Sequence, residues 1–71
     1  MSTRKVRRVT FVQRDGELAV DSAWATDTLS YFVRTALASK DKAITLTSVS
    51  GALFIVPRDT IKHITIEEVE V

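Results

Sequence analysis

The stretch Ser50-Gly51-Ala52-Leu53-Phe54-Ile55-Val56-Pro57 decides the fold that we expect for this chain of 71 residues. Its five consecutive apolar residues, 52–56, include aromatic and β-branched members and are typical of a strand buried on both faces. Ser50-Gly51 is a turn signal, and Pro57 ends the strand or lies at a sheet edge because it has no N–H to donate. A chain this short normally covers one face of a sheet, so we expect something else to cover the other.

The residues before this turn, 43–49, complete a hairpin with residues 52–57. Pairing Val49 with Ala52 across a two-residue turn sets the register, and the register decides which side chains face the core. The core face then carries Ile44, Leu46, Leu53 and Ile55. The opposite, open face carries Thr45, Thr47, Phe54 and Val56.

A first hairpin is expected where the β-branched run 6–13 meets Asp15-Gly16. This dipeptide indicates a two-residue turn, because both positions tolerate positive φ. If Arg14 pairs with Glu17, Phe11 faces Val20. The apolar face then carries Val9, Phe11, Leu18 and Val20, and the mixed face carries Arg8, Thr10, Val12, Arg14, Glu17, Ala19 and Asp21.

A helix is expected to begin at an N-cap, Thr26, with Asp27 in the first turn, where the helix dipole favours a carboxylate. Helical spacing predicts a buried stripe of Leu29, Phe32, Val33, Ala36 and Leu37. Residues 39–42 read as a polar connection. Trp24 either folds under the helix as a lid on the core, which we favour, or stands on the surface, where tryptophan is common in binding sites.

The last strand resumes the apolar pattern with Ile61, Ile64 and Ile66, and the alternation slips by one residue at Glu67-Glu68. A β-bulge there would send Val69 and Val71 to the open face of the sheet. The two valines are therefore a rival cover for that face from within the same chain.

Together these elements predict an α+β fold of two layers, with one helix packed on one face of a small, mostly antiparallel sheet, in the order β-β-α-β-β-β. We expect a single domain over residues 1–71, whose basic N-terminal end, residues 1–8, could be mobile. Contiguous apolar surface on the open face would mark an interface. Its candidates are Val12, Trp24, Phe54, Val56, Val69 and Val71.

Charge is balanced overall but lopsided along the chain, with 10 Lys and Arg against 9 Asp and Glu. The early basic residues Arg4, Lys5, Arg7 and Arg8 could form a nucleic-acid arm, whereas Glu67, Glu68 and Glu70 lie near the other end. The alternative is that the two terminal strands lie side by side and pair their charges, which we favour.

Composition narrows how so small a domain is stabilised. The chain has no cysteine, which excludes disulfides and thiolate metal sites, and its single histidine makes a His-based metal site improbable. Oligomerisation is the remaining common route for a domain of this size. We find no secretory signal and no apolar run long enough to span a membrane, so we expect a cytoplasmic protein without a membrane partner.

Several stretches resemble a family of short actinobacterial proteins of unknown function with the same order of elements. They are Gly16 to Ser22, the helix opening at Thr26, Leu46-Thr47 through Ser50-Gly51 to Phe54-Ile55-Val56-Pro57, and Ile64-Thr65-Ile66. The resemblance covers most of residues 6–67, and the basic start and acidic end depart from it. It implies the fold and an actinobacterial or phage source, and it implies no activity.

The chain carries no catalytic, cofactor or metal motif that we can defend, and we predict that it is not an enzyme. His63 has no orienting partner in a recognisable spacing, so we interpret it as an exposed strand residue. Our leading hypothesis is a protein-interaction, regulatory or accessory module that self-associates through the open face of its sheet, most simply as a symmetric dimer. Nucleic-acid binding is the second hypothesis, and a small-ligand sequestering oligomer, with its pocket between subunits, is the third.

Overall fold

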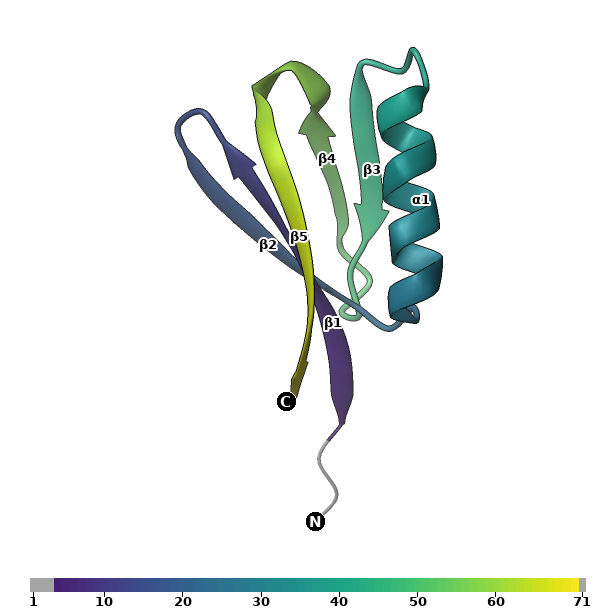
Figure 1. Cartoon of the computed structure of the whole chain (residues 1–71). Helices are drawn as coiled ribbons and strands as arrows, with labels where there is room; N and C mark the ends of the chain where they lie inside the picture. Colours follow the sequence, from purple (N-terminus) through teal and green to yellow (C-terminus); the bar gives the residue numbers. More distant parts are fainter. Residues whose placement is uncertain (1–3, 71) are drawn as a thin grey trace.

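The computed structural model describes residues 4–70. Its elements, in chain order, are β1 (Lys5–Gln13), β2 (Gly16–Ser22), α1 (Thr26–Ala38), β3 (Ala43–Thr47), β4 (Leu53–Pro57), the short 3-10 helix η1 (Arg58–Thr60) and β5 (Ile61–Glu70). Figure 1 shows this order along the chain. The predicted α+β class and the order β-β-α-β-β-β are confirmed.

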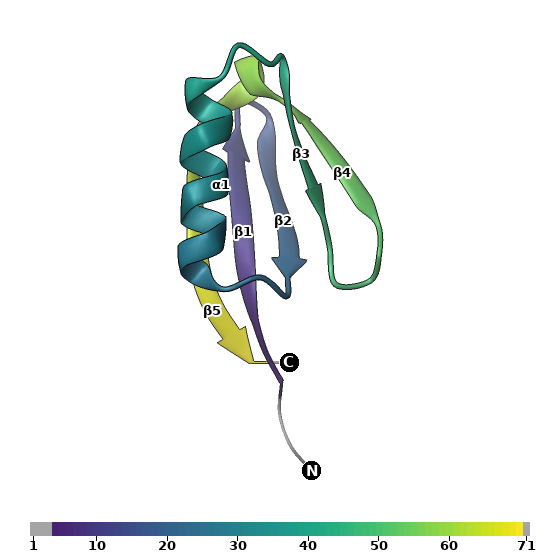
Figure 2. The same ribbon diagram turned by 90° about the vertical axis from the view of Figure 1, so that its right-hand side faces the viewer.

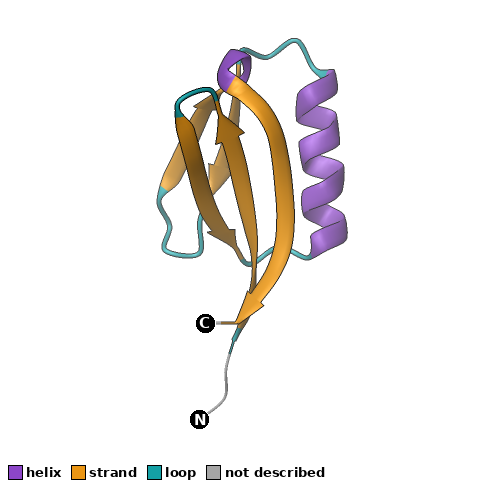
Figure 3. Cartoon of the chain, turned by 60° about the vertical axis from the view of Figure 1, so that its left-hand side comes forward, coloured by secondary structure: helices purple, strands orange, loops and turns teal. Residues whose placement is uncertain are grey.

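The strands form two antiparallel groups, a three-stranded sheet in the order β2-β1-β5 and the two-stranded hairpin β3-β4. In Figure 2, β3 runs beside β2 in the same direction, with α1 covering one face. The two groups meet at one end, where the Val49 N–H donates to the Asp21 carbonyl at 2.8 Å. Figure 3 shows the resulting layers, with the helix on one side and the strands on the other.

The core lies where the helix, the three-stranded sheet and the hairpin converge. Its buried members are Val9, Phe11, Val20, Leu29, Ile44, Leu46 and Val56. The helix contributes Leu29, and Phe32 and Ala36 pack at the margin. Leu37, predicted in the same stripe, is 41% exposed, so the stripe ends at Ala36. The N-cap is Ala25 and makes no side-chain cap bond, which corrects the prediction of Thr26.

The first hairpin forms as expected but with its register shifted by two residues. Val9 lies opposite Val20 and Phe11 opposite Leu18, because Arg14 and Asp15 form the turn and Gly16 starts β2. A shift by an even number keeps every side chain on its own face. The predicted apolar face is therefore the buried one, although the predicted pairs are wrong.

The second hairpin is shifted by one residue, and this reverses its faces. The turn has three residues: the Gly51 N–H donates to the Ser48 carbonyl at 3.0 Å, and Gly51 has a φ of 89°. This is the type I turn closed by a left-handed glycine that three-residue hairpins favour. Leu46 now lies opposite Phe54 and Ile44 opposite Val56.

The predicted faces of β4 are consequently wrong. Val56 is fully buried and Phe54 packs against the core, whereas Leu53 is 60% exposed and Ile55 is 64% exposed. The strand is apolar on both faces, as predicted, but its open face belongs to Leu53 and Ile55.

The predicted bulge at Glu67-Glu68 is also wrong. β5 pairs with β1 without interruption from Glu70 to His63, and the register shifts between Val12 and Gln13, which lies opposite Ile61. Regular alternation places Val69 opposite Val6, remote in register from the β3–β4 hairpin, so Val69 does not cover Phe54 or Val56. Val71 lies outside the described residues.

Arg58 in η1 connects the end of β4 to the end of the helix. Its guanidinium donates to the carbonyls of Ser39 and Leu37, and its backbone N–H donates to the Lys42 carbonyl at 2.9 Å. The last turn of α1 has no basic residue of its own. Arg58 therefore satisfies carbonyls that the helix leaves unpaired and places a positive charge at the negative end of its dipole.

Candidate interaction surface

The exposed side of the β3–β4 hairpin, which we call the outer hairpin face, consists of Thr45, Thr47, Leu53 and Ile55. Thr47 lies opposite Leu53 and Thr45 opposite Ile55. The two apolar side chains come from β4, and Val49 in the adjoining turn is 40% exposed. β-Branched threonines stabilise the strand without adding charge, so the face presents an uncharged strip.

β4 is also a free sheet edge, because within residues 4–70 it pairs with β3 and no other strand. Its hydrogen-bond phase follows from the bonds at its two ends, from the Ser48 N–H to the Ala52 carbonyl and from the Arg58 N–H to the Lys42 carbonyl, each 2.9 Å. In an antiparallel pair, bonded and non-bonded positions alternate. Phe54 and Val56 therefore bond to β3, while Leu53, Ile55 and Pro57 turn their backbone groups away from it.

The two outer edges of the molecule differ in charge. β5, at the edge of the three-stranded sheet, carries Lys62, Glu67, Glu68 and Glu70. Charged side chains of this kind discourage an edge from pairing with another chain. β4 carries no charged residue, and its one protective feature is Pro57 at its end. Of these two edges, β4 is the one suited to strand pairing.

The interface candidates predicted from the sequence do not form one exposed apolar face. Phe54 and Val56 belong to the core, and Val12 is half-buried on the sheet face that also carries Arg8. Trp24 remains 48% exposed while its ring meets Phe32 edge-on, with centroids 5.7 Å apart, so it is half lid and half surface.

Sequence reasoning missed Leu53 and Ile55 as surface residues. The signal that could have found them is the glycine itself. A glycine in the third position of a Val49-Ser50-Gly51 turn fits a three-residue loop as well as Ser50-Gly51 fits a two-residue loop.

The basic residues of β1 lie next to carboxylates, as expected from adjacent terminal strands. Lys5 Nζ is 3.4 Å from Glu68 Oε1, and Arg7 Nη2 is 3.6 Å from Glu68 Oε2. Arg4 is exposed and precedes the strand. The prediction that the two terminal strands pair their charges is confirmed.

Among the ion pairs of residues 4–70, Arg8 and Asp21 form the closest, on the sheet face opposite the core. Arg8 Nε donates to Asp21 Oδ1 at 2.8 Å and Nη2 donates to Oδ2 at 3.2 Å. This hydrogen-bonded contact lowers the pKa of Asp21 and raises the pKa of Arg8. The fork of the guanidinium is thus occupied by a carboxylate.

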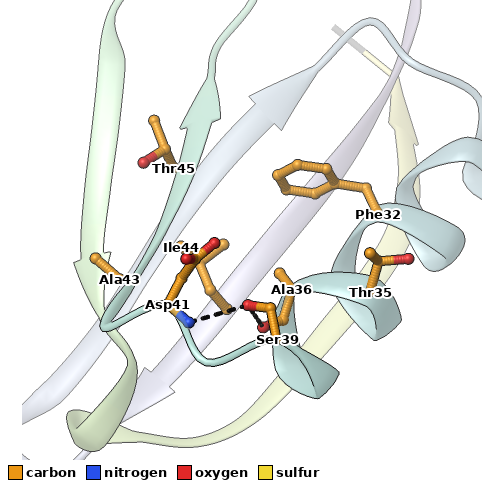
Figure 4. Close-up of a pocket in the computed structure, with 8 residues that line it drawn as sticks. All are labelled: Phe32, Thr35, Ala36, Ser39, Asp41, Ala43, Ile44 and Thr45. Atoms are coloured by element: carbon orange, nitrogen blue, oxygen red, sulfur yellow. Dashed lines mark hydrogen bonds between the residues drawn. The ribbon is translucent and has the colours of Figure 1, made fainter.

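A pocket of about 260 Å³ lies between the end of α1 and the start of β3 (Figure 4). The Ser39 hydroxyl donates to the Ala36 carbonyl at 2.9 Å and accepts the Asp41 N–H at 3.2 Å. These polar groups serve the end of the helix, and the volume is below the range of about 300–1,000 Å³ typical of ligand pockets. Residues 4–70 hold no group of three or more His, Cys, Asp or Glu side chains placed to bind a metal ion.

Comparison with protein-family models, with curated proteins and with solved structures found no match to this chain. The resemblance to short actinobacterial proteins therefore stays a prediction. No helix in the described part of the chain is both long and apolar enough to cross a membrane.

Proposed function

We propose that this protein is a non-enzymatic interaction module, with a regulatory or accessory role, that self-associates through its β3–β4 hairpin. The observation that carries the proposal is the exposure of Leu53 and Ile55 on an uncharged edge strand. Leu53 and Ile55 lie two residues apart on the same side of β4, and contiguous exposed apolar surface is a feature of interaction sites.

The energy available indicates a weak, reversible dimer. Full burial of a leucine or isoleucine side chain contributes about 1.5–3 kcal/mol, so covering the exposed parts of four such side chains contributes roughly 4–7 kcal/mol. Association itself costs about 4–15 kcal/mol, which new hydrogen bonds offset in part. With an association cost at the low end of that range and a few new hydrogen bonds of about 0.5–1.5 kcal/mol each, the net gain is about 5.5–7 kcal/mol, which corresponds to a dissociation constant on the order of 10–100 µM.

Sedimentation equilibrium or light scattering tests the proposal over about 5–500 µM protein, a range that brackets the expected dissociation constant. The parent mass should rise from 7.9 kDa toward twice that value with concentration. Ile55→Lys should remain monomeric, because it places like charges in the contact. The matched control is Tyr31→Lys, which changes an exposed aromatic residue on the helix and should behave like the parent.

A parent chain that stays monomeric at the highest concentration would contradict the proposal. So would an Ile55→Lys variant that associates as well as the parent.

The two other hypotheses remain predictions with less support. Three of the four basic candidates for a nucleic-acid arm have a carboxylate within 4.0 Å, which reduces the charge available to phosphates. Salt titration of binding to a generic duplex tests this arm. A ligand pocket between subunits requires the dimer first.

A further inference from the structure

We propose that two copies of this chain join edge to edge, with β4 of one copy antiparallel to β4 of the other, so that their hairpins form one four-stranded sheet. This inference rests on the proposed self-association and names its geometry. The alternative geometry is face-to-face packing of two outer hairpin faces.

The backbone of β4 supports the edge geometry. Leu53 and Ile55 each turn an N–H and a C=O away from β3, as the bonds at Ser48 and Arg58 fix, whereas the Pro57 carbonyl accepts the Thr60 hydroxyl at 2.8 Å. Residues two apart thus offer donors and acceptors in the phase that an antiparallel strand requires. A second copy of β4 offers the same groups in the reverse direction.

Two registers satisfy this pattern, and the one centred on Phe54 makes four intermolecular hydrogen bonds between unoccupied backbone groups. With a two-fold axis at Ile55, this residue faces the partner's Ile55 and exchanges two bonds. Each Leu53 N–H then faces the other copy's Pro57 carbonyl, which already accepts the Thr60 hydroxyl at 2.8 Å. With the axis at Phe54, each Leu53 faces the other copy's Ile55, and each of these two pairs exchanges two bonds.

Side chains favour a second copy as the occupant. In either register, the exposed Leu53 and Ile55 of one copy meet apolar side chains of the other, and no charge from β4 enters the contact. Apolar cross-strand pairs stabilise a sheet, and like charges directly opposite destabilise it. Pro57 limits the paired length, because it cannot donate beyond the end of the strand.

Amide hydrogen exchange measured by NMR at about 5 µM and 500 µM separates the two geometries without any mutation. At the higher concentration, edge pairing should slow exchange of the Leu53 and Ile55 amides about fivefold, because about four fifths of the chains become dimeric and only the remaining monomers exchange freely. The amides of Phe54 and Val56, which already bond to β3, are the internal control and should change little.

Cysteine cross-linking provides a second readout, since the chain has no native cysteine. Opposed Cα atoms in a sheet lie about 5.5 Å apart, within disulfide reach, whereas face-packed sheets lie about 10 Å apart, beyond it. Ile55→Cys should cross-link with itself if the axis is at Ile55, and with Leu53→Cys if it is at Phe54. Thr47→Cys, on the same face but on β3, is the control and should not cross-link.

A dimer in which the Leu53 and Ile55 amides exchange as in the monomer, and neither cysteine pair cross-links, overturns the edge geometry and leaves the proposed self-association intact. A monomer at every concentration overturns both. Selective protection of these two amides, or either expected cross-link without one at Thr47→Cys, supports it.

Discussion

The two faces of β4 predict opposite responses to the same substitution in neighbouring positions. Val56 is fully buried and Ile55 is 64% exposed, so Val56→Thr should destabilise the monomer strongly and Ile55→Thr only slightly. Threonine is a good strand former in both cases, which removes β-propensity from the comparison.

The magnitudes follow from burial. Val56→Thr removes one buried methyl group, about 0.8 kcal/mol, and buries a hydroxyl at a further cost of about 1–3 kcal/mol. We expect the free energy of unfolding to fall by about 2–4 kcal/mol. Ile55→Thr removes little buried surface, since about a third of the side chain is covered, and should cost below about 0.6 kcal/mol.

Urea and thermal unfolding, followed by circular dichroism and by the fluorescence of Trp24, measure both variants. The protein is kept at about 2 µM, well below the expected dimer dissociation constant, so that association does not contribute to stability. For a domain of this size 1 kcal/mol corresponds to about 4–8 °C, so Val56→Thr should lower Tm by about 10 °C or more. If Ile55→Thr costs as much as Val56→Thr, the assignment of the two faces is refuted.

Three further outcomes are expected. Because the contact with Arg8 lowers the pKa of Asp21, its stabilisation is present above the unfolded pKa of about 3.9 and is lost as the pH falls through the folded value. Asp21→Asn should therefore be less stable than the parent at pH 7, with a difference in urea midpoint that shrinks below about pH 4; a difference that persists at about pH 2 would contradict this. Arg58→Met should cost about 1–2 kcal/mol in thermal unfolding by freeing carbonyls at the end of α1, whereas Arg34→Met, on the exposed helix surface, should be near neutral. Gly51→Ala should cost about 1 kcal/mol through its φ of 89°, since no atom lies within 4 Å of the added methyl, and an unchanged midpoint would argue against a left-handed residue in this turn.

The sequence predicted the elements well because apolar periodicity and turn residues act locally. The class, the element order and the buried face of the first hairpin are confirmed, since an error of two residues in register preserves the face. The predicted register of the second hairpin is wrong because the turn has three residues where two were predicted, and a Ser-Gly pair fits either length. The candidate surface was mispredicted for the same reason: residues 52–56 are all apolar, so their sequence does not show which of them face the core.

The bulge in the last strand was misplaced because apolar alternation is ambiguous there. The alternation changes parity twice in the last strand, between Ile61 and Ile64 and again at Glu67-Glu68. The first change coincides with the register shift, and the second lets a regular strand direct Val69 toward the opposite face, beside Val6. Parity alone does not distinguish a bulge from a strand that is apolar on different faces along its length.

The bond from Val49 to Asp21 is the point at which backbone directly joins the hairpin to the edge of β2. No continuous ladder joins the two groups of strands within residues 4–70: this bond holds one end, and η1, whose Thr60 carbonyl accepts the Arg14 N–H at 3.0 Å, connects the other. The angle between the two groups is set in part by the volumes of the side chains between them, such as Val20 and Leu46. Buried core residues thus influence how β4 is oriented relative to the three-stranded sheet. Substitutions that change their size would alter the orientation of this edge strand without changing any residue on it.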